Sequence, residues 1–106
     1  MSARIQVPSE VKRGEVIQVR FLIQHDMETG YRFDDRGVPI PRNVIHTILC
    51  TFNGSEVLRA QTSSGISANP YVQFPMLATV SGELMLSWVD DLGVRGSERL
   101  AITVRE

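Results

Sequence analysis

Apolar and polar residues alternate with a period of two along much of this chain. In one run every second position is apolar, as in Ile17, Val19, Phe21 and Ile23. Side chains of a β-strand point alternately to its two faces, so this pattern predicts a strand with one face in a core. Leu22 interrupts the polar positions of this run. It would lie on the exposed face, where an apolar residue suits a partner contact.

Two further alternating runs predict a hairpin. Residues 84–88 and 100–104 carry apolar side chains at every second position, and Asp91-Leu92-Gly93 between them supplies turn residues. Met85 would lie on the polar face of the first run. Asn53-Gly54 is another turn signal, because both residues readily adopt the left-handed angles of a type I′ turn. The remaining strands are predicted over residues 3–7, 43–53, 56–62 and 71–80.

These elements amount to about seven antiparallel strands and no sustained helical pattern. A chain of 106 residues has room for one core, so we expect a single domain over residues 1–106. The number and spacing of the strands are typical of an all-β, immunoglobulin-like β-sandwich. With only one cysteine, the disulfide that joins the sheets of many immunoglobulin domains cannot form. Trp88 would pack against aliphatic side chains instead.

A long polar excursion spans residues 25–42. A loop of this length in so small a domain is usually functional or disordered. Tyr31, Phe33 and Pro39-Ile40-Pro41 offer a preorganised contact, and Met27 is of a type often placed at binding surfaces. The alternative is an ordinary loop with Met27 tucked beneath it.

Composition excludes several functional classes. The chain is 42% hydrophobic and 22% charged, which is typical of a globular domain. Eleven Lys and Arg nearly balance twelve Asp and Glu, so the net charge of −1 gives no reason to expect nucleic acid or a membrane surface as partner. No stretch approaches the ~18 apolar residues of a membrane span, and the first residues lack the pattern of a signal peptide. Composition alone favours a cytoplasmic location.

The candidate metal ligands are poorly spaced. His25, His46 and Cys50 with a methionine would be the ligand set of a copper site. His46 and Cys50 are four residues apart on one predicted strand, hence about 13 Å apart, which is too far to share an ion without a bulge. Cys50 alternates with Ile48 and Phe52 as a small buried hydrophobe does, and no basic neighbour activates its thiol. We expect no metal and no cofactor.

Acid–base and hydrolytic chemistry is also weakly supported. Asp34-Asp35 and Asp90-Asp91 are adjacent pairs whose side chains point apart, so both are interpreted as turn residues. No Gly-x-Ser-x-Gly motif or glycine-rich phosphate loop is present. We therefore expect no enzymatic activity. A small thiol-dependent redox module using Cys50 and a generic immunoglobulin-like interaction domain are the alternatives.

Four motifs occur in order along the chain. They are His25-Asp26-Met27-Glu28-Thr29-Gly30, Arg36-Gly37-x-Pro39-x-Pro41-Arg42, Cys50-Thr51-x-Asn53-Gly54 and Ala68-Asn69-Pro70-Tyr71. With these motifs the chain resembles the SoxZ family, one half of the SoxYZ sulfur-carrier complex of bacterial thiosulfate oxidation. The resemblance runs from Ile5 to Val104, and it too implies an immunoglobulin-like sandwich.

The resemblance implies a non-catalytic scaffold subunit. Its partner would be SoxY, in a heterodimer or higher heteromer, and the C-terminal cysteine of SoxY would carry the sulfur intermediates. The complex would dock transiently to other sulfur-oxidation enzymes. Cys50 lies mid-sequence in a stretch of structural character, so it is not the carrier thiol. SoxZ-like proteins have no export signal of their own, which implies a periplasmic location reached by co-export with SoxY.

Two groups of residues are expected to bind the partner. In the first motif, Met27 and Glu28 would be read by another protein, and Thr29-Gly30 would set the turn that presents them. The last motif and the apolar residues on otherwise polar strand faces complete the set: Asn69, Pro70, Tyr71, Leu22 and Met85, with Leu49 as a further candidate.

Overall fold

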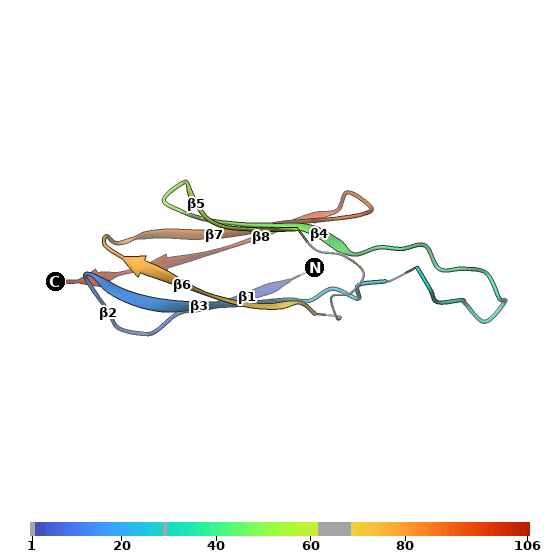
Figure 1. Cartoon of the computed structure of the whole chain (residues 1–106), viewed down its shortest axis with the longest axis horizontal. Helices are drawn as coiled ribbons and strands as arrows, with labels where there is room; N and C mark the ends of the chain where they lie inside the picture. Colours follow the sequence, from blue (N-terminus) through green and yellow to red (C-terminus); the bar gives the residue numbers. More distant parts are fainter. Residues whose placement is uncertain (1, 29, 62–68) are drawn as a thin grey trace.

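Two stacked β-sheets and a long projecting arm make up the molecule (Figure 1). The computed structural model describes residues 2–28, 30–61 and 69–106. One sheet has three strands in the order β1-β3-β6, and the other has four in the order β5-β4-β7-β8. All pairs within these two sheets are antiparallel. The prediction of an all-β, immunoglobulin-like sandwich is confirmed.

The seven longer strands overlap those expected from the alternating pattern, although the last one begins at Arg95 and ends at Ile102, ahead of the predicted run at residues 100–104. They are β1 (Ala3–Gln6), β3 (Glu15–Ile23), β4 (Ile45–Phe52), β5 (Ser55–Gln61), β6 (Tyr71–Ala78), β7 (Gly82–Asp90) and β8 (Arg95–Ile102). Two strands of two residues each, β2 (Val11–Lys12) and β9 (Val104–Arg105), form a separate parallel pair. The described part of the chain contains no helix that could cross a membrane.

The core lies between the two sheets. Its members come from alternate positions of the facing strands, and the largest fully buried ones are Phe21, Ile17, Ile23, Ile45, Ile48, Leu84 and Leu86. Phe21 and Phe74 meet edge to face, with ring centroids 6.4 Å apart and an interplanar angle of 69°. Such a pair adds about 1 kcal/mol beyond its burial. The period-two pattern therefore identified the buried faces of β3 and β7 correctly. In β4, Ile45 and Ile48 are both buried because the register shifts between Ile45 and Thr47.

The Asn53-Gly54 turn was predicted and is confirmed. Both residues have positive φ, 51° and 82°, as a type I′ hairpin between β4 and β5 requires. The Asn53 side chain has a further role, since its Oδ1 accepts a hydrogen bond from the Glu83 backbone N–H at 2.9 Å. It thereby ties the β4–β5 turn to the start of β7.

The predicted β7–β8 hairpin is also confirmed, and it encloses the only tryptophan of the chain. Trp88 is buried, and Gly96 is directly opposite it on β8. A Cβ on Gly96 would lie 2.2 Å from Cζ2 of the indole. The glycine is needed there because the ring lies across its backbone.

Each sheet turns its second face outward, and the two outward faces differ. On the three-stranded sheet, Val16 and Leu77 are paired across β3 and β6 and are 60% and 56% exposed. On the four-stranded sheet, the apolar residues Leu49 and Met85 are half-buried. The three-stranded sheet thus exposes more of its outward apolar side chains to solvent.

Candidate functional site

The excursion predicted at residues 25–42 forms a hydrogen-bonded arm, defined here as residues 26–28 and 30–43. It leaves the end of β3, runs away from the sandwich along its long axis and returns to the start of β4 (Figure 1). Backbone hydrogen bonds join its two limbs in three places. Glu28 and Asn43 exchange both N–H···O bonds at 2.8 Å, and Ile40 N–H donates to Arg32 O at 2.9 Å. Further out, Asp34 N–H donates to Val38 O at 2.9 Å.

A single carboxylate organises the tip of the arm. Asp34 Oδ1 accepts hydrogen bonds from the backbone N–H groups of Arg36 and Val38, at 2.8 and 3.0 Å. Gly37 then adopts a φ of 78° and donates its N–H to Asp34 O. The interpretation of Asp34 as a turn residue is therefore confirmed. The tip is shaped by local hydrogen bonds that need no partner protein.

A buried polar pair anchors the base of the arm. His25 Nε2 lies 3.1 Å from Asp90 Oδ2, and both side chains are almost fully buried. The other ring nitrogen, Nδ1, accepts a hydrogen bond from the Met27 N–H at 2.9 Å. Because Nδ1 uses its lone pair in this way, Nε2 carries the proton and donates to the carboxylate. The imidazole thus links β7 to the first residues of the arm.

Asp90 is held ionised by its neighbours. Burial raises the pKa of its carboxyl group, but hydrogen bonds from His25, the Val94 N–H, the Asn43 side chain and the Leu92 N–H outweigh burial and lower the pKa below its usual value. The two backbone bonds to Oδ1, from Val94 and Leu92, are 2.9 and 3.0 Å long. All of these contacts are structural. Asp90 closes the β7–β8 turn and positions His25, as expected for a turn aspartate.

The prediction that Met27 is an exposed contact is wrong. Its side chain is only 4% exposed and belongs to the core cluster. Met27 has a φ of 55°, and its sulfur accepts a hydrogen bond from Ile45 N–H at 3.3 Å. The backbone turns here because His25 holds the Met27 N–H, and this turn directs the thioether inward beneath the arm. The alternative interpretation, a methionine tucked under the loop, is the one that the structure shows.

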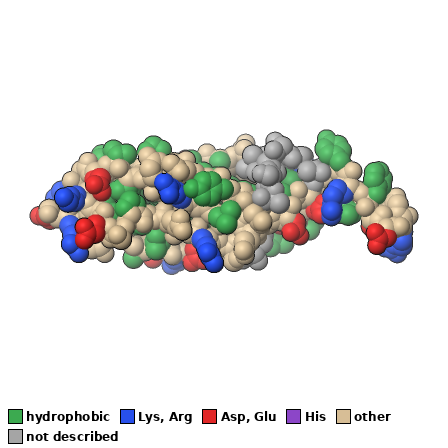
Figure 2. Space-filling view, turned by 90° about the horizontal axis from the view of Figure 1, so that it is seen from below, with side chains coloured by type: hydrophobic (Ala, Val, Ile, Leu, Met, Phe, Trp, Pro, Cys, Tyr) green, Lys and Arg blue, Asp and Glu red, His purple; other side chains and the backbone are tan. Residues whose placement is uncertain are grey.

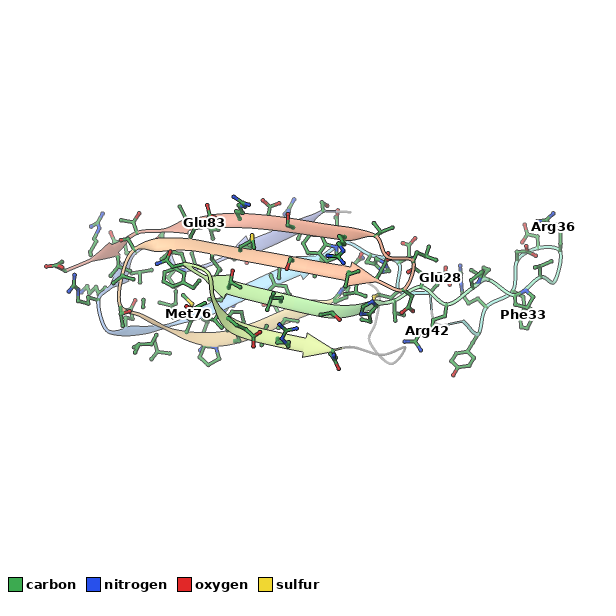
Figure 3. All side chains as sticks on the ribbon, turned by 90° about the horizontal axis from the view of Figure 1, so that it is seen from above. Glu28, Phe33, Arg36, Arg42, Met76 and Glu83 are labelled. Carbon is green, nitrogen blue, oxygen red and sulfur yellow. The ribbon has the colours of Figure 1, made fainter. Side chains whose placement is uncertain are left out.

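The other residues of the first motif lie at the arm base. Glu28 is half-buried and forms an ion pair with Arg32, with Arg32 Nη2 2.6 Å from its Oε1. Gly30 is exposed with a φ of 90°, and a Cβ there would lie 3.1 Å from Cβ of Arg42. Glu28 and Arg42 are near the sandwich in Figure 3, whereas Phe33 and Arg36 lie at the far end of the arm. Thr29 lies outside the described residues.

The last motif meets the first one at this base. Asn69 Oδ1 accepts a hydrogen bond from His25 N–H at 3.0 Å, and Asn69 N–H donates to His25 O at 2.8 Å. Pro70 is buried, and its carbonyl accepts the N–H of Ile23. Asn69 and Pro70 therefore hold the end of β3 in place. Both residues thereby position the base of the arm.

The remaining candidates lie far from one another. Tyr71 is exposed and sits directly opposite Leu22 on the outward face of the three-stranded sheet. Met85 lies on the outward face of the other sheet, on the far side of the core, where its cross-strand partners are Thr51 and Arg99. A single flat contact cannot cover both faces. The predicted set thus divides into an arm base and two opposite sheet surfaces.

Cys50 lacks the features of a reactive thiol. It is buried in the core, and burial raises its pKa to about 11. His46 bonds to its neighbour, with Nδ1 2.8 Å from Thr47 Oγ1. Over residues 2–28, 30–61 and 69–106, no group of three or more His, Cys, Asp or Glu side chains converges where it could hold a metal ion.

Sequence reasoning missed the buried His25–Asp90 pair and one exposed apolar pair on the three-stranded sheet. The His25–Asp90 pair joins residues 65 positions apart, and no local pattern signals it. The order of the arm did have a local signal, because Asp followed by Gly three residues later is a common turn pattern. The exposed cross-strand pair of Val16 and Leu77 was also missed.

Together these features define a class of protein: an immunoglobulin-like β-sandwich domain with a hydrogen-bonded hairpin arm anchored at one end. The model of the family described as "Sulphur oxidation protein SoxZ" matches residues 5–101. The chain belongs to the SoxZ family, and the resemblance inferred from the four motifs is confirmed. The family links the chain to sulfur oxidation.

Solved structures of similar fold come from other proteins. A superoxide reductase (neelaredoxin) from Ignicoccus hospitalis has a TM-score of 0.73 and 21% identity, covering 99% of this chain and 81% of that one. A putative superoxide reductase from Thermotoga maritima has a TM-score of 0.74 and 19% identity, covering 98% and 86%. At these identities the likeness shows the fold alone. No curated protein is similar enough in sequence to match the chain.

Proposed function

We propose that this chain is the non-catalytic scaffold subunit of a SoxYZ-type sulfur carrier, pairing with SoxY, whose C-terminal cysteine holds the sulfur intermediates of thiosulfate oxidation. The observation that carries the proposal is the outward face of the three-stranded sheet. Val16 and Leu77 form an exposed apolar pair at one end of it, and Tyr71 lies beside Leu22 at the other. Apolar side chains exposed next to one another in this way favour a protein interaction surface.

Figure 2 views this face directly. Hydrophobic side chains occur there in separate groups with charged and polar ones between them. The polar band includes Arg20, Gln18 and Gln73, and Gln73 Nε2 donates to Gln18 Oε1 at 3.1 Å. A partner with matching apolar groups would bury both pairs. The band between them would fix its orientation, because each buried polar group needs a hydrogen-bond partner.

The chemistry of the chain itself also favours a scaffold. Its one thiol is buried with a raised pKa, so it is poorly suited to accept or transfer sulfur. The ionised carboxylate of Asp90 is fully engaged in structural hydrogen bonds. Sulfur transfer would therefore take place on SoxY, and the heterodimer would dock transiently to other sulfur-oxidation enzymes. It would act in the periplasm, which the chain would reach by co-export with SoxY.

Co-expression tests this proposal. Produced together with SoxY, the chain is expected to co-purify with it as a stoichiometric complex and to appear in the periplasmic fraction. A SoxY variant without its export signal is the matched control, and it should retain both proteins in the cytoplasm. Absence of a complex, or periplasmic recovery of the chain without SoxY, would contradict the proposal.

A further inference from the structure

The outward face of the three-stranded sheet is small for a lasting interface. The register between β3 and β6 contains eight residue pairs. At about 3.3 Å per residue and 4.8 Å per strand, β3 and β6 together with the four-residue strand β1 present roughly 300 Å² of flat surface. A stable heterodimer buries about 800 Å² on each partner. The sheet face alone therefore supplies less than half of what lasting pairing requires, and the polar band of Gln18, Arg20 and Gln73 reduces its apolar part further.

The arm carries other prominent exposed apolar groups. Tyr31 is 82% exposed, Phe33 65% and Val38 51%. None of the three belongs to the core cluster or to the hydrophobic residues that pack against it. Aromatic side chains are enriched among the residues that dominate binding energy. Figure 3 shows Phe33 well away from the body of the sandwich, where a neighbouring protein can reach it.

The arm is already shaped for binding. Cross-limb hydrogen bonds and the Asp34 turn fix its course, and Phe33 and Pro39 form a bridge near the tip. Its base is tied to the sandwich by the His25–Asp90 pair and by the ion pair of Arg42 Nε with Asp91 Oδ2 at 3.1 Å. A preorganised element loses little conformational entropy on binding.

The charges of the arm are largely neutralised within the protein. Arg32 pairs with Glu28, Arg36 with Asp34, and Arg42 with Asp91. These pairs leave little net field to attract a charged partner. Recognition by the arm then rests on its apolar side chains, and the complementary surface is an uncharged apolar cleft that accepts an aromatic ring.

We propose that the arm is the second half of the interface with the carrier subunit: Phe33, Tyr31 and Val38 insert into an apolar cleft of the subunit whose remaining contact covers the Val16–Leu77 face. This inference rests on the proposed function, since it assigns a surface for the same partner. The arm extends the interface beyond the sheet. It binds the carrier subunit through apolar contacts whose strength does not depend on the salt concentration.

The test compares two truncations of similarly exposed apolar side chains. Phe33→Ala removes the ring from the arm, and Leu92→Ala removes a 68% exposed leucine from the β7–β8 turn as the matched control. Surface plasmon resonance with immobilised, purified SoxY gives the dissociation rate and Kd at low and at high salt. Phe33→Ala is expected to weaken binding about tenfold or more at both salt concentrations, mainly through faster dissociation. Leu92→Ala should bind as the wild-type chain does.

The outcomes separate the two proposals. If the wild-type chain does not bind SoxY, the proposed function fails, and the arm inference fails with it. If the wild type binds and Phe33→Ala binds equally well, only the arm inference is overturned. The arm would then be available to bind a different protein. An effect of Phe33→Ala that disappears at high salt would overturn the apolar mode of recognition. Thermal melting of both variants alone should match that of the wild type, because both side chains are outside the core.

Discussion

His25 and Asp90 lie 65 residues apart in the sequence, yet His25 Nε2 approaches Asp90 Oδ2 to 3.1 Å in the interior. The pair joins three parts of the fold. His25 holds the first turn of the arm through Met27 N–H and the Asn69 side chain, and Asp90 closes the β7–β8 turn through its second oxygen. The buried imidazole therefore helps to set the direction in which the arm leaves the sandwich.

Removing that imidazole should destabilise the protein strongly. His25→Ala leaves the Asp90 carboxylate and the Met27 N–H buried without their partner, which costs about 3 kcal/mol. Urea unfolding followed by fluorescence measures the loss of unfolding free energy. His46→Ala is the matched control, because His46 is half-buried and bonds only to its neighbour Thr47 among the contacts described above, so its loss should cost well below ~1 kcal/mol. Equal losses for the two variants would show that the His25–Asp90 pair is not a structural anchor.

Stability should fall in acid through Asp90. Hydrogen bonds lower the pKa of this carboxyl group in the folded protein. The stabilisation is therefore present above the unfolded-state pKa of about 3.9 and is lost as the pH falls through the lower folded-state pKa. Urea unfolding between neutral pH and strong acid should show this loss. Asp90→Asn is expected to be less stable at neutral pH and to show a shallower acid slope, whereas Asp35→Asn at the exposed tip should follow the wild type. If the stability of Asp90→Asn fell with decreasing pH as steeply as that of the wild type, other carboxylates would be responsible for the acid sensitivity.

The Cys50 thiol should be protected in the native protein. Burial raises its pKa to about 11, so little reactive thiolate forms at neutral pH and reagents cannot reach the sulfur. A polar disulfide reagent is expected to label the native chain slowly and the urea-unfolded chain rapidly. Because the folded-state pKa is raised, stability should also decline as the pH rises from about 9 towards 11. Rapid labelling of the native chain would instead favour a thiol-dependent redox module.

A methyl group added at Gly96 should disrupt the packing of Trp88. The new Cβ would lie 2.2 Å from the indole, so the ring or β8 must shift, at a cost of about 1–3 kcal/mol. Trp88 is the only tryptophan, and its fluorescence reports the rearrangement directly. Ser97→Ala, at the adjacent and exposed position of the same strand, is the control and should change neither fluorescence nor melting temperature. Tolerance of Gly96→Ala with an unchanged spectrum would show that the ring has room to move.

Local patterns predicted the sandwich well. Alternation identified the buried faces of β3 and β7 because side-chain direction in a strand depends only on its own backbone. The turn at Asn53-Gly54 was equally predictable, because these residues tolerate positive φ. Leu22 and Met85 were correctly placed on outward faces. These two faces lie on opposite sides of the molecule because of the way the sheets stack. The alternating pattern within a strand gives no information about that stacking.

The arm base shows where local reasoning fails. Met27 follows β3, and the alternating pattern of that strand does not predict the left-handed backbone of Met27. The hydrogen bond from the Met27 N–H to His25 turns the Met27 side chain inward. The bonds between His25 and Asn69 and between His25 and Asp90 are likewise tertiary. The family motifs did mark this region. They mark residues that position the arm, while the exposed apolar groups lie further out, at Tyr31, Phe33 and Val38.

Binding of SoxY by charge-substituted variants is the most direct measurement of the proposed scaffold function. Leu77→Glu places a carboxylate in the exposed Val16–Leu77 pair, and Met85→Glu places one on the outward face of the opposite sheet. Isothermal titration calorimetry with purified SoxY is expected to show tight, stoichiometric binding of the wild type, wild-type affinity for Met85→Glu, and loss of binding for Leu77→Glu. No binding by the wild type would contradict the scaffold function itself. Binding retained by Leu77→Glu and lost in Met85→Glu would place the partner on the other face of the sandwich.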